Sequence, residues 1–301
     1  MLTIVQAALE AGFLYAPIAL ALFLSFSILN IADMTTDGAF VLGSAVSAMM
    51  CLAGHPILAL PAGMAVSAAA GFVTAFLQTK LAVPSILAGI VTNIGLYSIN
   101  LMVMGKSNQS LFQTDTIYTM AKDAGFAGSW YELAVTAIIV LALCALLVLF
   151  LGTRLGLSIR ATGDNADMVR ASSINPNFTI TVGLCVANAM TGLSGAMVAQ
   201  YSTFADVNSG TGMVVLALAA LVIGETLIGK GSMTRRVLGV VAGSIIYRFI
   251  YAAALRFNVP ADYMKLVSAV IVGVAIAAPA VRRWAAFQMQ KRRALAGRRG
   301  E

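Results

Sequence analysis

Charged residues are scarce in this chain of 301 residues: they make up 10% of the sequence, against about 25% in soluble domains. Histidine occurs once, at His55, and cysteine three times, at Cys51, Cys144 and Cys185. These few residues give no disulfide framework, no metal-ligand spacing and no Ser-His-Asp set. The sequence therefore predicts neither a soluble domain nor an enzyme, and it predicts no metal site.

Hydrophobic residues, in contrast, form 60% of the chain, and the mean hydropathy is +0.91. They gather in runs that are long enough for membrane-spanning helices and that do not alternate as the strands of a membrane β-barrel do. We expect an all-α polytopic membrane protein with about nine helical spans. The runs are 4–29, 36–54, 56–79, 82–105, 131–152, 177–201, 209–228, 236–256 and 263–281.

Two of these runs are candidates for half-helices or re-entrant segments, namely the run after Asp37 and the run around Gly210–Gly224. Broken helices of this kind line the substrate path in many transporters. The predicted organisation is one transmembrane domain over residues 1–281, followed by a basic tail over residues 282–301.

The positions of lysine and arginine predict the orientation, because these residues are enriched in cytoplasmic loops. If the polar segment 153–176 is cytoplasmic, most of the 19 basic residues fall on the same side. The N-terminus is then outside and the C-terminus inside. This distribution explains the net charge of +7 without a nucleic-acid partner, and the basic tail fits the anionic inner surface of a lipid membrane.

Segment 153–176 is the one long polar stretch between two strongly apolar runs. It reads as a short amphipathic helix with a turn at residues 162–165, and Asp164 or Asn165 can cap a second helix. We expect Met168, Val169 and Ala171 to cluster on one side of that helix. A docking segment for a soluble partner is one interpretation, and a solvated loop whose cations only set orientation is the other.

The same segment resembles the coupling segment of bacterial ABC importer permeases, specifically the branched-chain amino-acid and ribose permease type. The matching residues are Gly156, Arg160, Ala161, Gly163 and Asn165. Ser173-Ile174 departs from the usual Gly-Ile of that type. Two further stretches extend the resemblance over most of the chain: NIADMTTDGAFVLG from Asn30 and LALAALVIG from Leu216.

The resemblance implies a multi-pass subunit of the bacterial inner membrane that works with several partners. These are cytoplasmic ABC ATPase subunits, an extracytoplasmic substrate-binding protein and a second permease subunit, identical in single-permease systems. The outward loop 105–129 is a candidate contact for the binding protein. The NIADMTTDG stretch is closest to single-permease systems for amino acids, aromatic ones included, with sugars and nucleosides as alternatives.

ATP and magnesium are expected in the partner ATPase and no cofactor in this chain. The stretch GETLIGKG at residues 224–231 nearly matches a phosphate-binding loop, but Gly231 stands where that loop has Ser or Thr. The resemblance assigns the contact with the ATPase, or the turn that shapes it, to Arg160, Gly163, Asp164, Asn165, Met168 and Arg170.

Polar residues near membrane depth are costly, so they are candidates for a translocation path. The candidates are Asn30, Asp33, Thr36, Asp37, Asn93, Asn188 and Arg248. The first four also fit a capping turn between helices, and Asn93 and Asn188 fit hydrogen bonds between helices. Arg248 can snorkel outward, pair with Asp206 or Glu225, or lie near an outer gate.

Three other classes of function remain open. A secondary transporter or channel would need an ion-coupling site, for which the membrane acids are few. A membrane scaffold would move no solute. A membrane-embedded enzyme would need a catalytic set that the sequence lacks.

Overall fold

The computed structural model describes residues 2–256 except 124, 126, 127, 129 and 230, and also residues 266, 269, 270, 273, 274 and 277. The basic tail over 282–301 and most of the run 263–281 lie outside the described residues. Within them the chain is helical, as predicted. The elements are α1 Leu2–Leu14, α2 Ala16–Leu22, η1 Phe23–Ile28, α3 Thr36–Leu52, α4 Pro56–Thr79, α5 Ser85–Met104, β1 Asn108–Ser110, α6 Ile117–Asp123, α7 Tyr131–Gly152, α8 Arg154–Asp164, α9 Ala166–Ala171, α10 Pro176–Ser202, β2 Phe204–Asp206, η2 Val207–Gly210, α11 Met213–Ile228 and α12 Met233–Arg256.

Seven of the described helical stretches are long and apolar enough to cross a membrane, and the chain is thus a polytopic helical protein. The first of them runs without a break through α1, α2 and η1. The predicted run 36–54 forms the shorter apolar helix α3. The ninth run falls mostly outside the described residues, so the count of nine spans stays a prediction.

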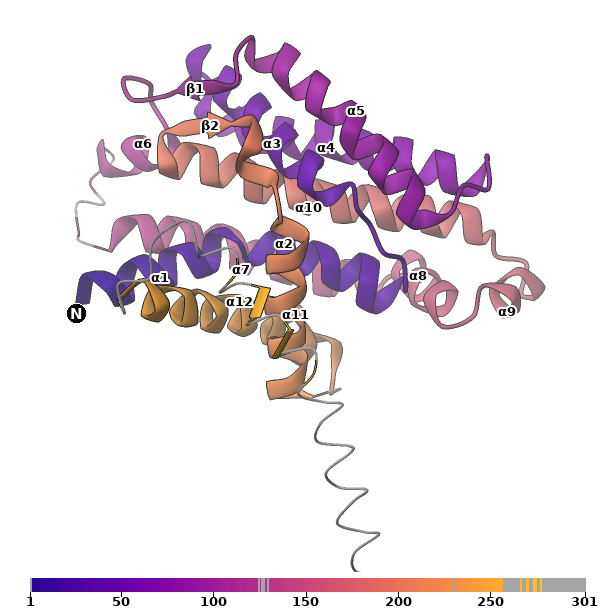
Figure 1. Ribbon diagram of the computed structural model, residues 1–301. Helices are drawn as coiled ribbons and strands as arrows, with labels where there is room; N and C mark the ends of the chain where they lie inside the picture. Colours follow the sequence, from indigo (N-terminus) through magenta and orange to yellow (C-terminus); the bar gives the residue numbers. More distant parts are fainter. Residues whose placement is uncertain are drawn as a thin grey trace, which may run out of the picture.

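Helix α10 forms the centre of the bundle and packs against α3 and α4 over much of its length (Figure 1). The packing is close because glycines lie at the crossings. Side-chain atoms on Gly43 of α3 would overlap Gly192 of α10, and those on Gly195 would overlap the Phe40 carbonyl. The small-residue faces of α10 therefore bring backbones together, as such faces do in membrane proteins.

The polar elements of the molecule gather at its two ends. Figure 1 shows α8 and α9 at one end of the bundle, and β1, β2 and α6 at the other. β1 and β2 form an antiparallel ribbon in which Gln109 lies opposite Ala205. No pattern in the sequence predicted this ribbon. It ties the loop after α5 to the loop after α10.

The chain is interrupted before each of the two runs that were candidates for half-helices. The first run forms the short helix α3, whereas the second belongs to Val207–Ile228, one of the seven stretches long enough to cross a membrane. Residues 29–35 turn back into the bundle from the end that carries α8, and α3 begins partway along it (Figure 1). After β2, the short helix η2 and a turn at Thr211-Gly212 precede α11. The N-termini of α3 and α11 meet beside each other, at Asp37.

Candidate functional site

The carboxylate of Asp37 joins the starts of two helices. Asp37 lies in the first turn of α3, and its two oxygens accept hydrogen bonds from the Gly212 amide at 3.0 Å and the Val214 amide at 2.9 Å. Gly212 is the N-cap of α11 and has no side chain with which to cap the helix. The unpaired amides of a helix N-terminus need an acceptor and favour a negative charge. The Asp37 carboxylate, which lies on the different helix α3, supplies both the acceptor and the negative charge.

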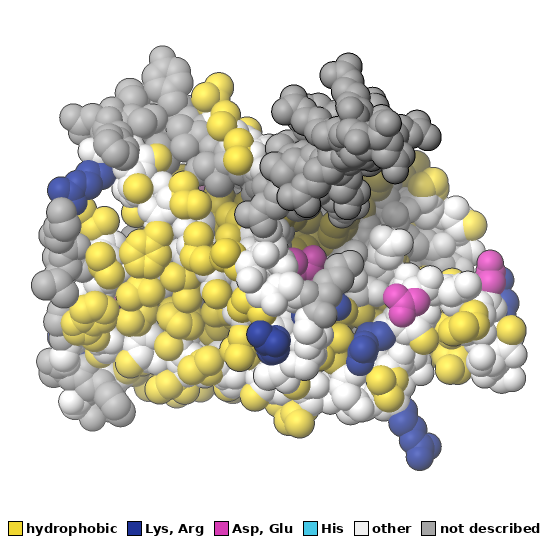
Figure 2. Space-filling model, turned by 90° about the horizontal axis from the view of Figure 1, so that it is seen from below, with side chains coloured by type: hydrophobic (Ala, Val, Ile, Leu, Met, Phe, Trp, Pro, Cys, Tyr) yellow, Lys and Arg dark blue, Asp and Glu magenta, His cyan; other side chains and the backbone are white. Residues whose placement is uncertain are grey.

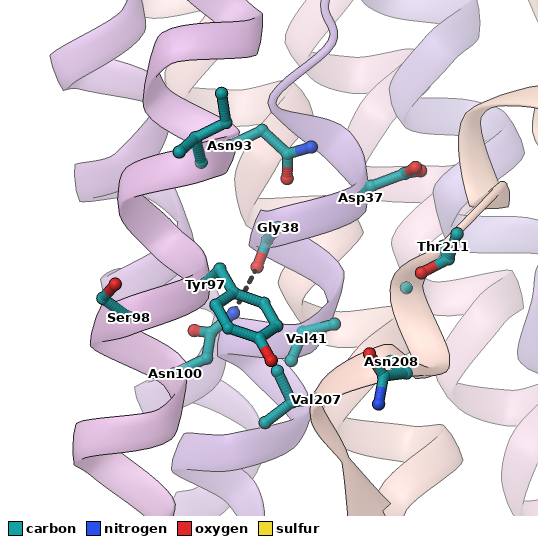
Figure 3. A pocket seen from close by; sticks show the side chains of 12 residues that line it. Asp37, Gly38, Val41, Asn93, Tyr97, Ser98, Asn100, Val207, Asn208 and Thr211 are labelled. Atoms are coloured by element: carbon teal, nitrogen blue, oxygen red, sulfur yellow. Dashed lines mark hydrogen bonds between the residues drawn. The ribbon is translucent and has the colours of Figure 1, made fainter. Parts of the chain in front are cut away.

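A pocket of about 430 Å³ lies beside this junction. Figure 3 shows α5 on one side, α3 in the middle and the loop before α11 on the other. Among the described residues that line it, none is Lys or Arg, and Asp37 is the only one with a charged side chain. The lining residues are Asp37, Gly38, Val41, Asn93, Ile94, Tyr97, Ser98, Asn100, Val207, Asn208, Gly210 and Thr211.

The wall of the pocket on α5 combines an aromatic ring with amides. Asn93, Tyr97 and Asn100 follow each other at helical spacing on one face. Asn100 is buried and donates to the Gly38 carbonyl at 3.2 Å, while its own carbonyl oxygen has no partner among the described residues. Tyr97 and Ile94 are exposed on the outer face of α5. The pocket therefore opens on that face.

Asp33 forms a second polar cluster, buried behind the pocket. Its side chain accepts from the Thr35 amide at 2.9 Å and from Asn188 of α10 at 2.7 Å, and the residue is 3% exposed. The Thr36 hydroxyl donates to the Asp33 carbonyl at 3.1 Å, and the Thr35 hydroxyl bonds that of Thr74 on α4 at 2.7 Å. This cluster fixes the segment that leads into α3.

Six of the seven predicted path residues lie in the pocket or at the segment before α3, and the seventh, Arg248, lies apart. Asp37 and Asn93 line the pocket. Asp33, Thr36 and Asn188 hold the segment before α3, and Asn30 is exposed in a left-handed conformation with φ 57° at the start of that segment. Sequence reasoning missed Tyr97, Asn100, Asn208 and Thr211. The spacing of Asn93, Tyr97 and Asn100 was the signal that would have found the α5 wall.

Arg248 lies apart from this pocket. Its guanidinium stacks 3.7 Å above the ring of Tyr15, and the residue lines a separate apolar groove between α1 and α12. The expected ion pairs of Arg248 are wrong. Glu225 pairs instead with Arg236 at 2.7 Å, and the Asp206 carboxylate accepts from the Asn208 amide at 2.6 Å as the cap of η2. The aromatic face stabilises the cation by a cation–π contact, while the buried Nε of Arg248 has no hydrogen-bond partner among the described residues.

The segment 153–176 folds into two helices, α8 and α9. Asn165 is the N-cap of α9, because its side chain accepts from the Met168 amide at 3.0 Å, and this confirms one of the two predicted caps. The predicted turn is shorter than expected, since α8 continues through Asp164. The expected apolar cluster on α9 is also wrong, because Val169 is buried and Met168 is 54% exposed.

The outer surface of α8 and α9 mixes exposed apolar and charged side chains. Asp164, Asn165, Met168 and Arg170 are exposed, and Arg160 and Gly163 are half-buried. Leu155 and Leu157 also reach the surface. In Figure 2 hydrophobic side chains cover the left of the face, while most of the coloured Lys, Arg, Asp and Glu lie toward the side where Figure 1 places α8 and α9. A mixed surface of this kind is suited to a protein contact.

Comparisons with known proteins agree with one another. Residues 4–276 match the family model described as branched-chain amino acid transport system / permease component. A tyrosine transport system permease protein of Clostridioides difficile is 32% identical over 255 residues, which cover 84% of each chain. The ribose import permease protein of Escherichia coli K12 is 27% identical over 81% of this chain and 75% of its own. An autoinducer 2 import system permease protein of Yersinia enterocolitica is 26% identical over 82% of this chain and 66% of its own. No solved structure matches the chain.

Proposed function

This chain belongs to the branched-chain amino acid transport permease family, and we propose that it is the transmembrane subunit of an ATP-driven importer in a bacterial inner membrane. The observation that carries the proposal is the junction at Asp37. Two helices begin there partway along the bundle, and a pocket that is lined by both polar and apolar side chains opens beside them. Breaks in helices within a membrane are tolerated where they line a cavity, and many transporter binding sites are built in this way.

The proposed substrate is an amino acid, with aromatic amino acids foremost. The tyrosine transport permease supports this choice, and the ring of Tyr97 beside the amides of Asn93 and Asn100 offers both stacking and hydrogen bonds. The ribose and autoinducer 2 permeases keep sugar-like solutes as the alternative. The alternatives differ in one respect that can be tested, since a sugar carries neither an ammonium nor a carboxylate group.

The proposed partners bind at three surfaces. A cytoplasmic ABC ATPase, which would hold ATP and magnesium, contacts α8 and α9. A substrate-binding protein delivers the solute at the opposite end, where Phe112 beside the β-ribbon is 84% exposed. A second copy of the chain closes the open side of the pocket along α5, whose Ile94 and Met102 are exposed. With this arrangement the start of α1 is outside. The C-terminus lies outside the described residues, and its position inside stays a prediction.

The contact with the ATPase can be tested by placing two acidic side chains on α8 and α9. We expect Arg160→Glu combined with Met168→Glu to reduce co-purification of the ATPase with the chain about tenfold or more, because a buried contact would then carry two unpaired carboxylates. Pull-down from membranes that contain both proteins measures this. The control is Met120→Glu on α6, at the other end of the bundle, where Met120 is 41% exposed.

The outcome of this pull-down separates the proposed importer from its rival. Loss of the ATPase with the α8–α9 variant, and retention with Met120→Glu, supports the importer. Retention with both variants contradicts the assignment of α8 and α9. If no ABC ATPase accompanies the unaltered chain, a secondary transporter becomes the better account.

A further inference from the structure

The helix before Asn30 contains a π-helical turn, η1, at Phe23–Ile28. Its widened hydrogen bonding continues past its end, because the Leu29 amide donates to the Leu24 carbonyl at 3.0 Å and the Ile31 amide to the Ser25 carbonyl at 2.9 Å. Wide turns of this type are rare and frequently mark functional positions in helices. η1 belongs neither to the pocket nor to the α8–α9 surface. It contacts α8, and the chain that follows it leads to Asp37 in the pocket wall.

Helix α8 contacts the end of this wide turn through Gly163. A Cβ atom at Gly163 would overlap the carbonyl oxygen of Ile28 and come within 2.9 Å of the Cα atom of Leu29. The backbones of α8 and η1 therefore touch directly. Beside this contact, the Thr162 hydroxyl bonds the Thr179 hydroxyl of α10 at 2.8 Å. Among the described elements of the bundle, α8 contacts α7, α10 and η1. Of these three, η1 is the one from which the chain reaches the pocket within ten residues, at Asp37.

The chain after η1 reaches the pocket by a short and firmly held path. Residues 29–35 start with Asn30 in its left-handed conformation, a position of backbone strain. Asp33 then bonds Asn188, and Thr36 begins α3. One residue later Asp37 holds the N-terminus of α11. Displacing Ile28 would therefore move both helix starts that border the pocket.

We propose that the contact between Gly163 and the Ile28 carbonyl passes the movement of α8 to the pocket, through η1 and residues 29–35. Gly163 is then a positioning residue that faces the bundle and not the ATPase. The inference rests on the proposed function, because it supplies a route for ATP-driven movement. The competing route runs through the Thr162–Thr179 bond into α10.

Gly163→Ala tests the contact with a single methyl group. The added methyl pushes α8 away from η1 and leaves the covalent connections of α8 in place. We expect ATP-dependent uptake to fall about tenfold, with ATP hydrolysis by the assembled complex unchanged within about twofold. The control is Gly152→Ala at the end of α7, where a Cβ atom would meet no other atom within 4 Å. Thr162→Val removes the bond to Thr179 and tests the competing route.

A reporter in the pocket distinguishes lost transmission from general damage. Thr211 lines the pocket and is exposed on the loop before α11 (Figure 3), so Thr211→Cys serves as the reporter, in a chain that has Cys51, Cys144 and Cys185 replaced by alanine. We expect ATP with vanadate to change the rate of maleimide labelling at position 211 when Gly163 is present, and not in Gly163→Ala. If Gly163 had only a structural role, Gly163→Ala would also change the labelling rate in the absence of nucleotide.

Hydrogen–deuterium exchange of the unaltered complex provides a measurement without substitution at Gly163. Peptides covering residues 23–35 are expected to change their exchange with ATP and vanadate. Three results overturn the inference: wild-type labelling in Gly163→Ala, loss of the response in Thr162→Val alone, or no change in exchange over 23–35 while 153–176 responds. If the unaltered complex shows no ATP-dependent uptake at all, the proposed function fails, and the inference fails with it.

Discussion

Replacement of Asp37 with alanine is expected to reduce uptake about a hundredfold. The carboxylate accepts two backbone amides at the start of α11, at 2.9 and 3.0 Å. Hydrogen bonds to a charged group contribute about 1.5–3 kcal/mol each, and 1.4 kcal/mol corresponds to a factor of about ten. Loss of both bonds frees the N-terminus of α11 from α3 and disorganises the wall of the pocket.

Two further variants sharpen this prediction. Asp37→Asn keeps one oxygen acceptor but places an amide donor against the donors of α11, so its uptake should lie between wild type and Asp37→Ala. Gly152→Ala adds a methyl group at the end of α7, where a Cβ atom would meet no other atom within 4 Å, and should transport normally. Uptake by all four proteins is compared at equal amounts in the membrane. Normal uptake by Asp37→Ala would show that the junction does not organise the transport site.

Asp33→Ala is expected to destabilise the folded protein by about 3 kcal/mol. Asp33 is buried, and its loss leaves the Thr35 amide without its acceptor and the Asn188 amide with only the Leu184 carbonyl. Uptake should fall with stability, because these bonds hold the segment that enters α3. The measurement is the thermal midpoint in detergent, together with uptake at a temperature well below it.

A double-mutant cycle with Asn188→Ala isolates the bond between the two side chains. Each single variant removes the 2.7 Å contact, so the double variant should be less destabilised than the sum of the two by about 1–3 kcal/mol. Additive effects would mean that Asp33 acts through Thr35 alone. The cycle thus separates the contribution to stability of the Asp33–Asn188 bond to α10 from that of the local bond to the Thr35 amide.

The sequence predicted the helical membrane architecture because composition and run length decide it. Runs of apolar residues with 10% charge leave no alternative to helices in lipid. The two interruptions were also predicted, since NIADMTTDG and the glycines near 210 break apolar runs. The wide turn at Phe23–Ile28 was not, because its sequence FLSFSI is apolar like the helix that contains it.

The site was predicted only in part, for a physical reason. Asp37 and Asn93 stand out as polar residues in apolar runs, and both line the pocket. The partners of the Asp37 carboxylate could not be predicted, because they are backbone amides 175 and 177 residues away. Backbone amides carry no signal in the sequence. Arg248 shows the same limit, since its cation lies on Tyr15 and not on an acidic residue.

The division of α9 into a buried and an exposed side illustrates a further limit. Met168 and Val169 are adjacent apolar residues, and the sequence pattern predicted that they face the same side. In the structure Val169 is buried while Met168 is half exposed. Which of two adjacent apolar residues faces the bundle depends on how the short helix is anchored, here by Asn165 and Pro176 at its two flanks.

The most direct test of the proposed importer is uptake of labelled tyrosine into proteoliposomes that contain this chain with its co-purifying ATPase and binding protein. We predict uptake that requires ATP and the ATPase, that competes with other aromatic amino acids, and that ribose leaves unchanged. Uptake driven by an ion gradient with the ATPase absent would contradict the account.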